Sequence, residues 1–153
     1  MNFSFSIEEE HFTQQMQSFF LEEKETADKA KQEYESGLGF GPNCWKILQK
    51  IGERGWICPT WPLKYGGLEL SFIYKYISKE QLHYYTGIPG LVGAGMAGPI
   101  ILSHGTEKQK DYYLLPIAKG EVEYTLGYTE PDAGSDLAAL MMDAEDKGNH
   151  FPR

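Results

Sequence analysis

The sequence has little cysteine, little positive charge and no cluster of metal-ligating residues, and each shortage argues against a class of protein. Only two cysteines occur among the 153 residues, Cys44 and Cys58, without a C-x-x-C pair, and the four histidines are not spaced as metal ligands. A metal site and a disulfide framework are therefore not expected, and two reduced thiols are. Lys and Arg number 14 against 22 Asp and Glu, a net charge of −8. Without a basic patch, nucleic-acid binding is not expected.

A long apolar run is missing as well. The stretch 87–102 carries no charge, but it is sixteen residues long and contains Pro89, Pro99 and five glycines. It is too short and too interrupted to span a bilayer, so it predicts a buried helix or a cavity wall. The first residues show neither a secretory nor a mitochondrial address, and the predicted location is cytoplasmic. A hydrophobic content of 41% with 14% aromatic residues is that of a globular protein with a core.

Helical signals fill the chain up to about residue 120. Ser6 and Glu9 form a capping box, Pro42 stands at a helix start, Ser71 is a cap, and Thr106 with Gln109 forms another capping box. Apolar residues recur at helical spacing behind these starts. The predicted helices cover 7–35, 42–52, 72–85, 89–105 and 107–116. The third is expected to be apolar at Phe72, Ile73, Tyr76, Ile77 and Tyr84. The candidate core residues are Phe19, Trp45, Leu48, Ile51, Trp56, Ile77, Leu102 and Leu114.

After Gly120 the pattern changes. Residues 124–129 have the composition of a strand, and a turn rich in small and polar residues follows at 130–136. Pro131 fixes its own φ and Gly134 permits a positive φ, so amides near Gly134 and the Ser135 hydroxyl can face an anion. The alternative is an ordinary surface turn, which is what most turns of this composition are. The sequence thus predicts an all-α domain over 1–122 and the first strands of an incomplete β-domain over 123–153.

The turn and the segments before it contain specific sequence motifs. The run Tyr128-Thr129-Glu130-Pro131-x-Ala133-Gly134-Ser135-Asp136 closely resembles the flavin-binding signature of acyl-CoA dehydrogenases. Upstream, Gly55-Trp56, Pro59, Pro62 and Tyr65-Gly66-Gly67 resemble the family's loop between helices. The block 105–110, followed by Tyr113-Leu114-Leu115-Pro116, resembles its helix leading into the signature. The blocks stand in family order, and the resemblance runs from about Ile7 to Phe151.

The resemblance implies a fold and a cofactor. The fold would be the N-terminal helical bundle of an acyl-CoA dehydrogenase, followed by the start of its middle β-domain. The cofactor would be FAD, with Leu126, Tyr128 and Thr129 facing the flavin and Gly134 and Ser135 approaching its pyrophosphate. Ser135 would also approach the nucleotide of the bound thioester. From the residues alone, Thr129 is equally compatible with an ordinary strand position.

The resemblance also implies an acyl cavity lined by Ile88, Leu91 and Gly95. Four glycines in the predicted helix 89–105 (Gly90, Gly93, Gly95 and Gly98) each cost about 1 kcal/mol relative to alanine, and they either leave space for a ligand or permit close helix packing. The residues themselves leave this choice open.

The family reaction removes an α-proton with a glutamate and transfers a β-hydride to the flavin. That glutamate belongs to a C-terminal helical domain that this chain does not contain, so no catalytic residue is assigned and the chain is expected to be an N-terminal fragment or a truncated form. The implied partners are an acyl-CoA, further copies of the chain and an electron-transfer flavoprotein. The alternative is a non-catalytic helical binding or interaction module derived from the family.

Overall fold

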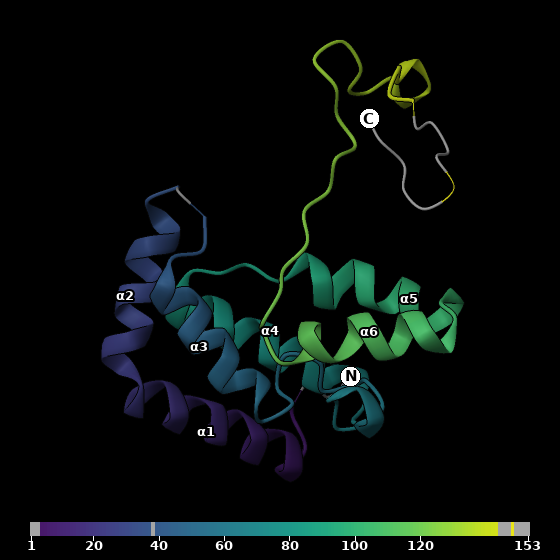
Figure 1. Cartoon of the computed structure of the whole chain (residues 1–153). Coiled ribbons are helices and arrows are strands. Elements are labelled where there is room, and N and C mark those ends of the chain that lie inside the picture. The colour runs from purple at the N-terminus through teal and green to yellow at the C-terminus, as the bar shows by residue number, and fades with distance from the viewer. Residues whose placement is uncertain (1–3, 38, 144–147, 149–153) are drawn as a thin grey trace.

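Six α-helices form the body of the molecule within the residues that the computed structural model describes, which are 4–37, 39–143 and 148. Figure 1 shows the helices packed together and the C-terminal segment leading away from them. The helices are α1 (Ile7–Glu22), α2 (Lys24–Glu35), α3 (Pro42–Gly52), α4 (Phe72–Thr86), α5 (Gly98–His104) and α6 (Glu107–Ala118). A π-helical turn, Gly93–Ala97, precedes α5, and 3₁₀ turns occur at Leu63–Tyr65 and Leu137–Ala139. The predicted all-α class is confirmed.

The first predicted helix, 7–35, is in fact two helices. The capping box of Ser6 and Glu9 starts α1 as expected, but the chain bends at Glu23, and α2 leaves at a steep angle in Figure 1. Packing explains the bend, because α1 lies against α4 whereas α2 lies mainly against α3. Lys50 of α3 donates to the carboxylate of Glu23 and holds the corner in place. No proline or glycine lies at this position, so the apolar pattern continues across it and predicts a single helix.

The helix predicted over 42–52 is confirmed, and it depends on a cap from another helix. Pro42 begins α3, and the carboxylate of Glu33, on α2, accepts hydrogen bonds from the backbone N–H groups of Asn43 (2.8 Å) and Cys44 (3.0 Å). These are among the N-terminal amides that a helix cannot satisfy itself. One face of α3 is buried against α1, α2 and α4 in the larger apolar core, which includes Phe19, Leu48 and Ile51 as predicted. Trp45 and Trp56 were expected in this core but are only partly buried at its edge.

The helix α4 has a different buried face from the one predicted. Ile77 is buried as expected and Leu82 joins it, while Phe72, Tyr76 and Tyr84 are exposed at 75%, 51% and 72%. The aromatic residues repeat at helical spacing too, so the pattern alone could not tell the core face from the opposite one. Phe72 and Tyr76 instead reach the edge of a groove that is described below.

A second, smaller core lies between the loop after α3 and the helices α5 and α6. It is formed by Cys58, Trp61, Tyr65, Ala94, Leu114, Ile117 and Ala118. The capping box of Thr106 and Gln109 begins α6 as predicted, and the helix continues past Pro116 to Ala118. Of the predicted core residues in this part, Leu114 is fully buried and Leu102 only partly.

The predicted strand 124–129 is not formed within the described residues. The backbone there runs exposed and without a strand partner, and an isolated bridge between Glu130 and Ala133 is the β-type pairing present in the described part of the chain. A second strand was predicted to begin in residues 148–153, of which all but Gly148 lie outside the described residues. No helix in the described part is long and apolar enough to cross a membrane.

Candidate functional site

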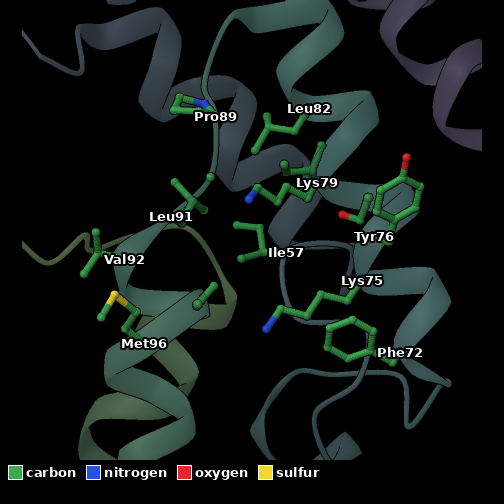
Figure 2. A pocket seen from close by; sticks show the side chains of 15 residues that line it. Ile57, Phe72, Lys75, Tyr76, Lys79, Leu82, Pro89, Leu91, Val92 and Met96 are labelled. Atoms are coloured by element: carbon green, nitrogen blue, oxygen red, sulfur yellow. The ribbon is translucent and has the colours of Figure 1, made fainter.

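An apolar groove lies between α4 and the segment 89–96, as Figure 2 shows. Its volume is about 570 Å³, which is within the usual range of small-molecule sites. Its lining residues come from the end of α3, the loop after it, one face of α4, and the chain from Pro89 into the π-helical turn. They are Ile51, Ile57, Phe72, Lys75, Tyr76, Ser78, Lys79, Leu82, Pro89, Gly90, Leu91, Val92, Ala94, Gly95 and Met96.

The four glycines of this segment serve different ends. A Cβ on Gly98 would overlap the ring of Trp61, and a Cβ on Gly93 would stand 3.2 Å from Tyr124 and 3.3 Å from Ile117. These two glycines permit close packing. Gly95 has nothing within 4 Å of a Cβ position and opens onto the groove, whereas Gly90 lies before the helix with a φ of +149°. Packing and open space, which the sequence left as alternatives, therefore both occur, at different positions.

Of the three predicted acyl-cavity residues, two line the groove and one does not. Leu91 and Gly95 line the groove. Ile88 does not: it is fully buried in the larger core, and its N–H lies 3.3 Å from the hydroxyl of Thr86, which caps the turn after α4. In this chain Ile88 therefore supports the groove from behind. The three residues were grouped by the family resemblance, and the helical backbone that carries Gly95 begins only at Val92.

Two lysines were missed at the sequence level. Lys75 and Lys79 stand four residues apart on α4, and Figure 2 shows both side chains directed across the groove. Ser78, a further polar lining residue on α4, donates its hydroxyl hydrogen to the backbone carbonyl of Trp56. The available signal was the four-residue spacing of the lysines on a predicted helix, which places them on one face.

The predicted flavin-facing residues lie in the segment that leads away from the helices. Leu126, Tyr128, Thr129, Gly134 and Ser135 are all exposed. The backbones of Glu130 and Ala133 exchange two hydrogen bonds, of 3.0 and 3.2 Å, around Pro131 and Asp132. This tight turn brings Thr129 back to Gly134, with 4.0 Å between the Thr129 methyl carbon and a Cβ position on Gly134.

The turn is stabilised by a residue whose role the sequence did not show. The carboxylate of Glu130 accepts hydrogen bonds from the backbone N–H groups of Met141 (2.9 Å) and Met142 (2.7 Å). The signature therefore folds into a closed local loop. Thr129, Gly134 and Ser135 are exposed on this loop.

Glu123 joins this segment to the groove. Its carboxylate accepts a hydrogen bond of 2.8 Å from the N–H of Gly93, at the start of the π-helical turn. The neighbouring Tyr124 packs on the smaller core, and burial raises the pKa of its hydroxyl, with nearby Tyr113 and Glu123 adding to the effect. The beginning of the signature segment is thus fixed to the element that carries Gly95.

The helical part of the chain matches a known protein family. The sequence profile described as "Acyl-CoA dehydrogenase, N-terminal domain" matches residues 6–121. The chain belongs to the acyl-CoA dehydrogenase family.

Individual relatives match beyond the helical part. "Acyl-CoA dehydrogenase FadE26" of Mycobacterium tuberculosis is 28% identical over 99% of this chain and 38% of the relative. The solved structure "Tcur3481-Tcur3483 steroid ACAD" superposes with a TM-score of 0.83 at 30% identity, over 99% of this chain and 39% of that one. The structure of the ChsE4–ChsE5 complex from Mycobacterium tuberculosis superposes with a TM-score of 0.77 at 28% identity, over 99% of this chain and 38% of that one. The chain thus spans less than two fifths of the length of these relatives.

Proposed function

We propose that the chain forms the acyl-binding helical domain, residues 1–122, and the first part of the flavin-binding β-domain, 123–153, of a flavin-dependent acyl-CoA dehydrogenase. The observation that carries the proposal is the apolar groove opened by Gly95, one hydrogen bond away from the segment with the flavin signature. The family membership supplies the reaction class, and the groove supplies a place for the acyl chain.

The groove accounts for binding of the acyl group. Leu82, Leu91 and Met96 offer apolar surface, and each methylene of an acyl chain that leaves water there gains about 0.8 kcal/mol. The names of relatives do not narrow the acyl type, because they include short-chain, isovaleryl-CoA and medium-chain enzymes. For this chain the open position at Gly95 favours a medium, long or ring-bearing acyl group.

The signature segment accounts for one side of an FAD site. Leu126, Tyr128 and Thr129 would face the ring, and Gly134 and Ser135 would face the pyrophosphate, with Ser135 also near the nucleotide of the thioester. Bound FAD supplies an acceptor for the β-hydride. The residues fit this role because all five are exposed in or just before one local loop and the segment starts from the groove wall.

The remaining chemistry is assigned outside these residues. No acidic side chain among the described residues lines the groove, so the described part of the chain offers no base at the α-carbon there. The base would come from the rest of a longer protein or from another subunit. A solved neighbour is a complex of two proteins and another is titled as an electron-transferring flavoprotein, which supports a homo-oligomer or a partner subunit and an electron-transfer flavoprotein as acceptor. The cytosolic location belongs to the same proposal.

A second candidate follows from the same absence. A groove without a base also suits a non-catalytic module that binds an acyl thioester or a partner without transforming it. Turnover separates the two candidates: the module gives none in any assembly, whereas the enzyme domain gives turnover once the remaining part of the site is supplied.

The test compares binding of octanoyl-CoA and CoA to the chain by titration calorimetry, with Gly95→Leu as the variant. We expect octanoyl-CoA to bind more tightly than CoA, and Gly95→Leu to remove most of this gain in affinity. For butyryl-CoA, whose acyl chain is shorter, the same substitution should change the affinity relative to CoA little. Gly95→Ala is the matched control, because a methyl group fits the open space. Equal affinity for CoA and octanoyl-CoA would contradict the proposed acyl groove.

A further inference from the structure

The two lysines of the groove form no ion pair within the described residues, as is also true of Lys46, Lys108 and Lys119. Six others form ion pairs, namely Lys24, Lys29, Lys31, Lys50, Lys64 and Lys110. Within the described part of the chain, no carboxylate lies within ion-pair distance of Lys75 or Lys79, and none of the lining residues is acidic. The Lys75 ammonium instead lies 5.6 Å from the centre of the Phe72 ring.

Their positions direct both charges into the groove. Lys79 lies against the backbone of Gly90, where a Cβ would stand 3.2 Å from its Cε and 3.8 Å from its Nζ. Lys75 is close enough to the buried Cys58 to lower the pKa of that thiol, against the larger opposing effect of burial. Figure 2 shows the two ammonium groups on the same side of α4, facing Leu91 and Met96.

We propose that the groove binds an acyl group that carries a carboxylate remote from its thioester, and that Lys75 and Lys79 bind this carboxylate. This inference rests on the proposed function, because it concerns the acyl group of the same site. Two like charges four residues apart on a helix repel each other, and a single anion between them relieves the repulsion. The apolar walls fit the methylenes, and the ammonium groups fit the only charge that such an acyl group has.

The phosphates of CoA are the other anions that an acyl-CoA brings. They are a poorer match for this groove, since a phosphate needs several donors and the remaining lining groups are mostly apolar, with the Ser78 hydroxyl already donated to Trp56. The exposed turn at Gly134 and Ser135 offers backbone and hydroxyl donors outside the groove. An experiment separates the two sources by changing the acyl end and the CoA part independently.

The experiment measures the Kd of adipoyl-CoA, hexanoyl-CoA and CoA for the chain by titration calorimetry at 0.15 M salt. Adipoyl and hexanoyl groups have the same number of carbons and differ in the terminal carboxylate. We expect adipoyl-CoA to bind about tenfold more tightly than hexanoyl-CoA, as charge-assisted hydrogen bonds give. In the double variant Lys75→Met/Lys79→Met this ratio should fall to about 1, whereas Lys75→Arg/Lys79→Arg should retain most of it.

Lys108→Met/Lys119→Met is the matched control, because both lysines are exposed, on α6 and at its C-cap, neither lines the groove, and their loss removes the same two charges. It should leave the ratio unchanged, and thermal melts of all variants check that they fold. A ratio near 1 in the unmodified chain, or one that survives the double methionine variant, overturns the inference while acyl binding stands. Loss of CoA binding in the double variant assigns the lysines to phosphate and also overturns it. Equal binding of hexanoyl-CoA and CoA instead contradicts the proposed function itself.

Discussion

At the scale of single residues, the glycines before α5 make opposite predictions for the same substitution. Gly98→Ala places a methyl group into the ring of Trp61, which is wedged between the loop and α5, so we expect a loss of about 1–3 kcal/mol in the free energy of unfolding. Gly95→Ala meets open space in a helical backbone and should be neutral or stabilise by up to about 1 kcal/mol. Urea denaturation of both variants tests this. Similar losses at both positions would show that Gly95 is a packing glycine after all.

The two cysteines give a second prediction at this scale. Cys44 is fully buried and donates to the carbonyl oxygen of Ala30 at 3.2 Å, and Cys58 is 3% exposed. Burial raises the pKa of both thiols, so little thiolate, the reactive form, exists at neutral pH. We expect no reaction of the native chain with an aromatic disulfide reagent within minutes, and reaction of both thiols in denaturant. Rapid native labelling of either thiol would place it at the surface.

At the scale of elements, the corner between α1 and α2 depends on one ion pair. The hydrogen bond from Lys50 is the main cause that lowers the pKa of the Glu23 carboxyl below 4.5, against a smaller opposing effect of burial. A lowered pKa stabilises the fold above the unfolded value, and this stability is lost as the pH falls through the folded value. The contribution is therefore complete at pH 7, and it is lost as the pH falls below 4.5 and through the lower folded value.

Lys50→Met removes that contribution. We expect a loss on the order of 0.5–1 kcal/mol at pH 7, since both side chains are about one third exposed or less, and a smaller loss at pH 3. Lys29→Met is the control, because its pair with Glu25 is largely exposed on α2 and should change stability less. Denaturation at the two pH values gives both numbers. A Lys50→Met effect that persists undiminished at pH 3 would mean that its methylenes, not its charge, hold the corner.

The elements also show what a sequence can predict. The starts of α1, α3 and α6 were predicted because their signals are local: two capping boxes and one N-terminal proline. The bend at Glu23 was missed because its cause, packing of α1 and α2 on different helices, is not local. The groove was predicted only in part, because some of its features are local in the sequence and others are not. Its glycine wall is visible as composition, but the burial of Ile88 and the direction of Lys75 and Lys79 depend on how α4 packs against α1 and α2.

At the scale of the whole molecule, the chain has a packed helical part and a C-terminal part with few internal contacts. The strand predicted over 124–129 has suitable residues, but a strand needs a neighbour, and the described chain provides none. Its composition therefore predicts an element that only a partner segment can complete. The link through Glu123 and Tyr124 fixes where such an element would begin relative to the groove.

Hydrogen exchange should show this division directly. The amides of α1 and α3 are bonded within helices whose apolar faces are buried in the larger core, so we expect them to exchange slowly. The amides of 124–129 donate to no described residue and should exchange fast in a dilute sample, with those of Glu130 and Ala133 intermediate because their turn closes locally. Protection of 124–129 that grows with protein concentration would indicate strand pairing between copies. Protection at the lowest concentration would contradict the prediction, because it requires a partner strand within one chain.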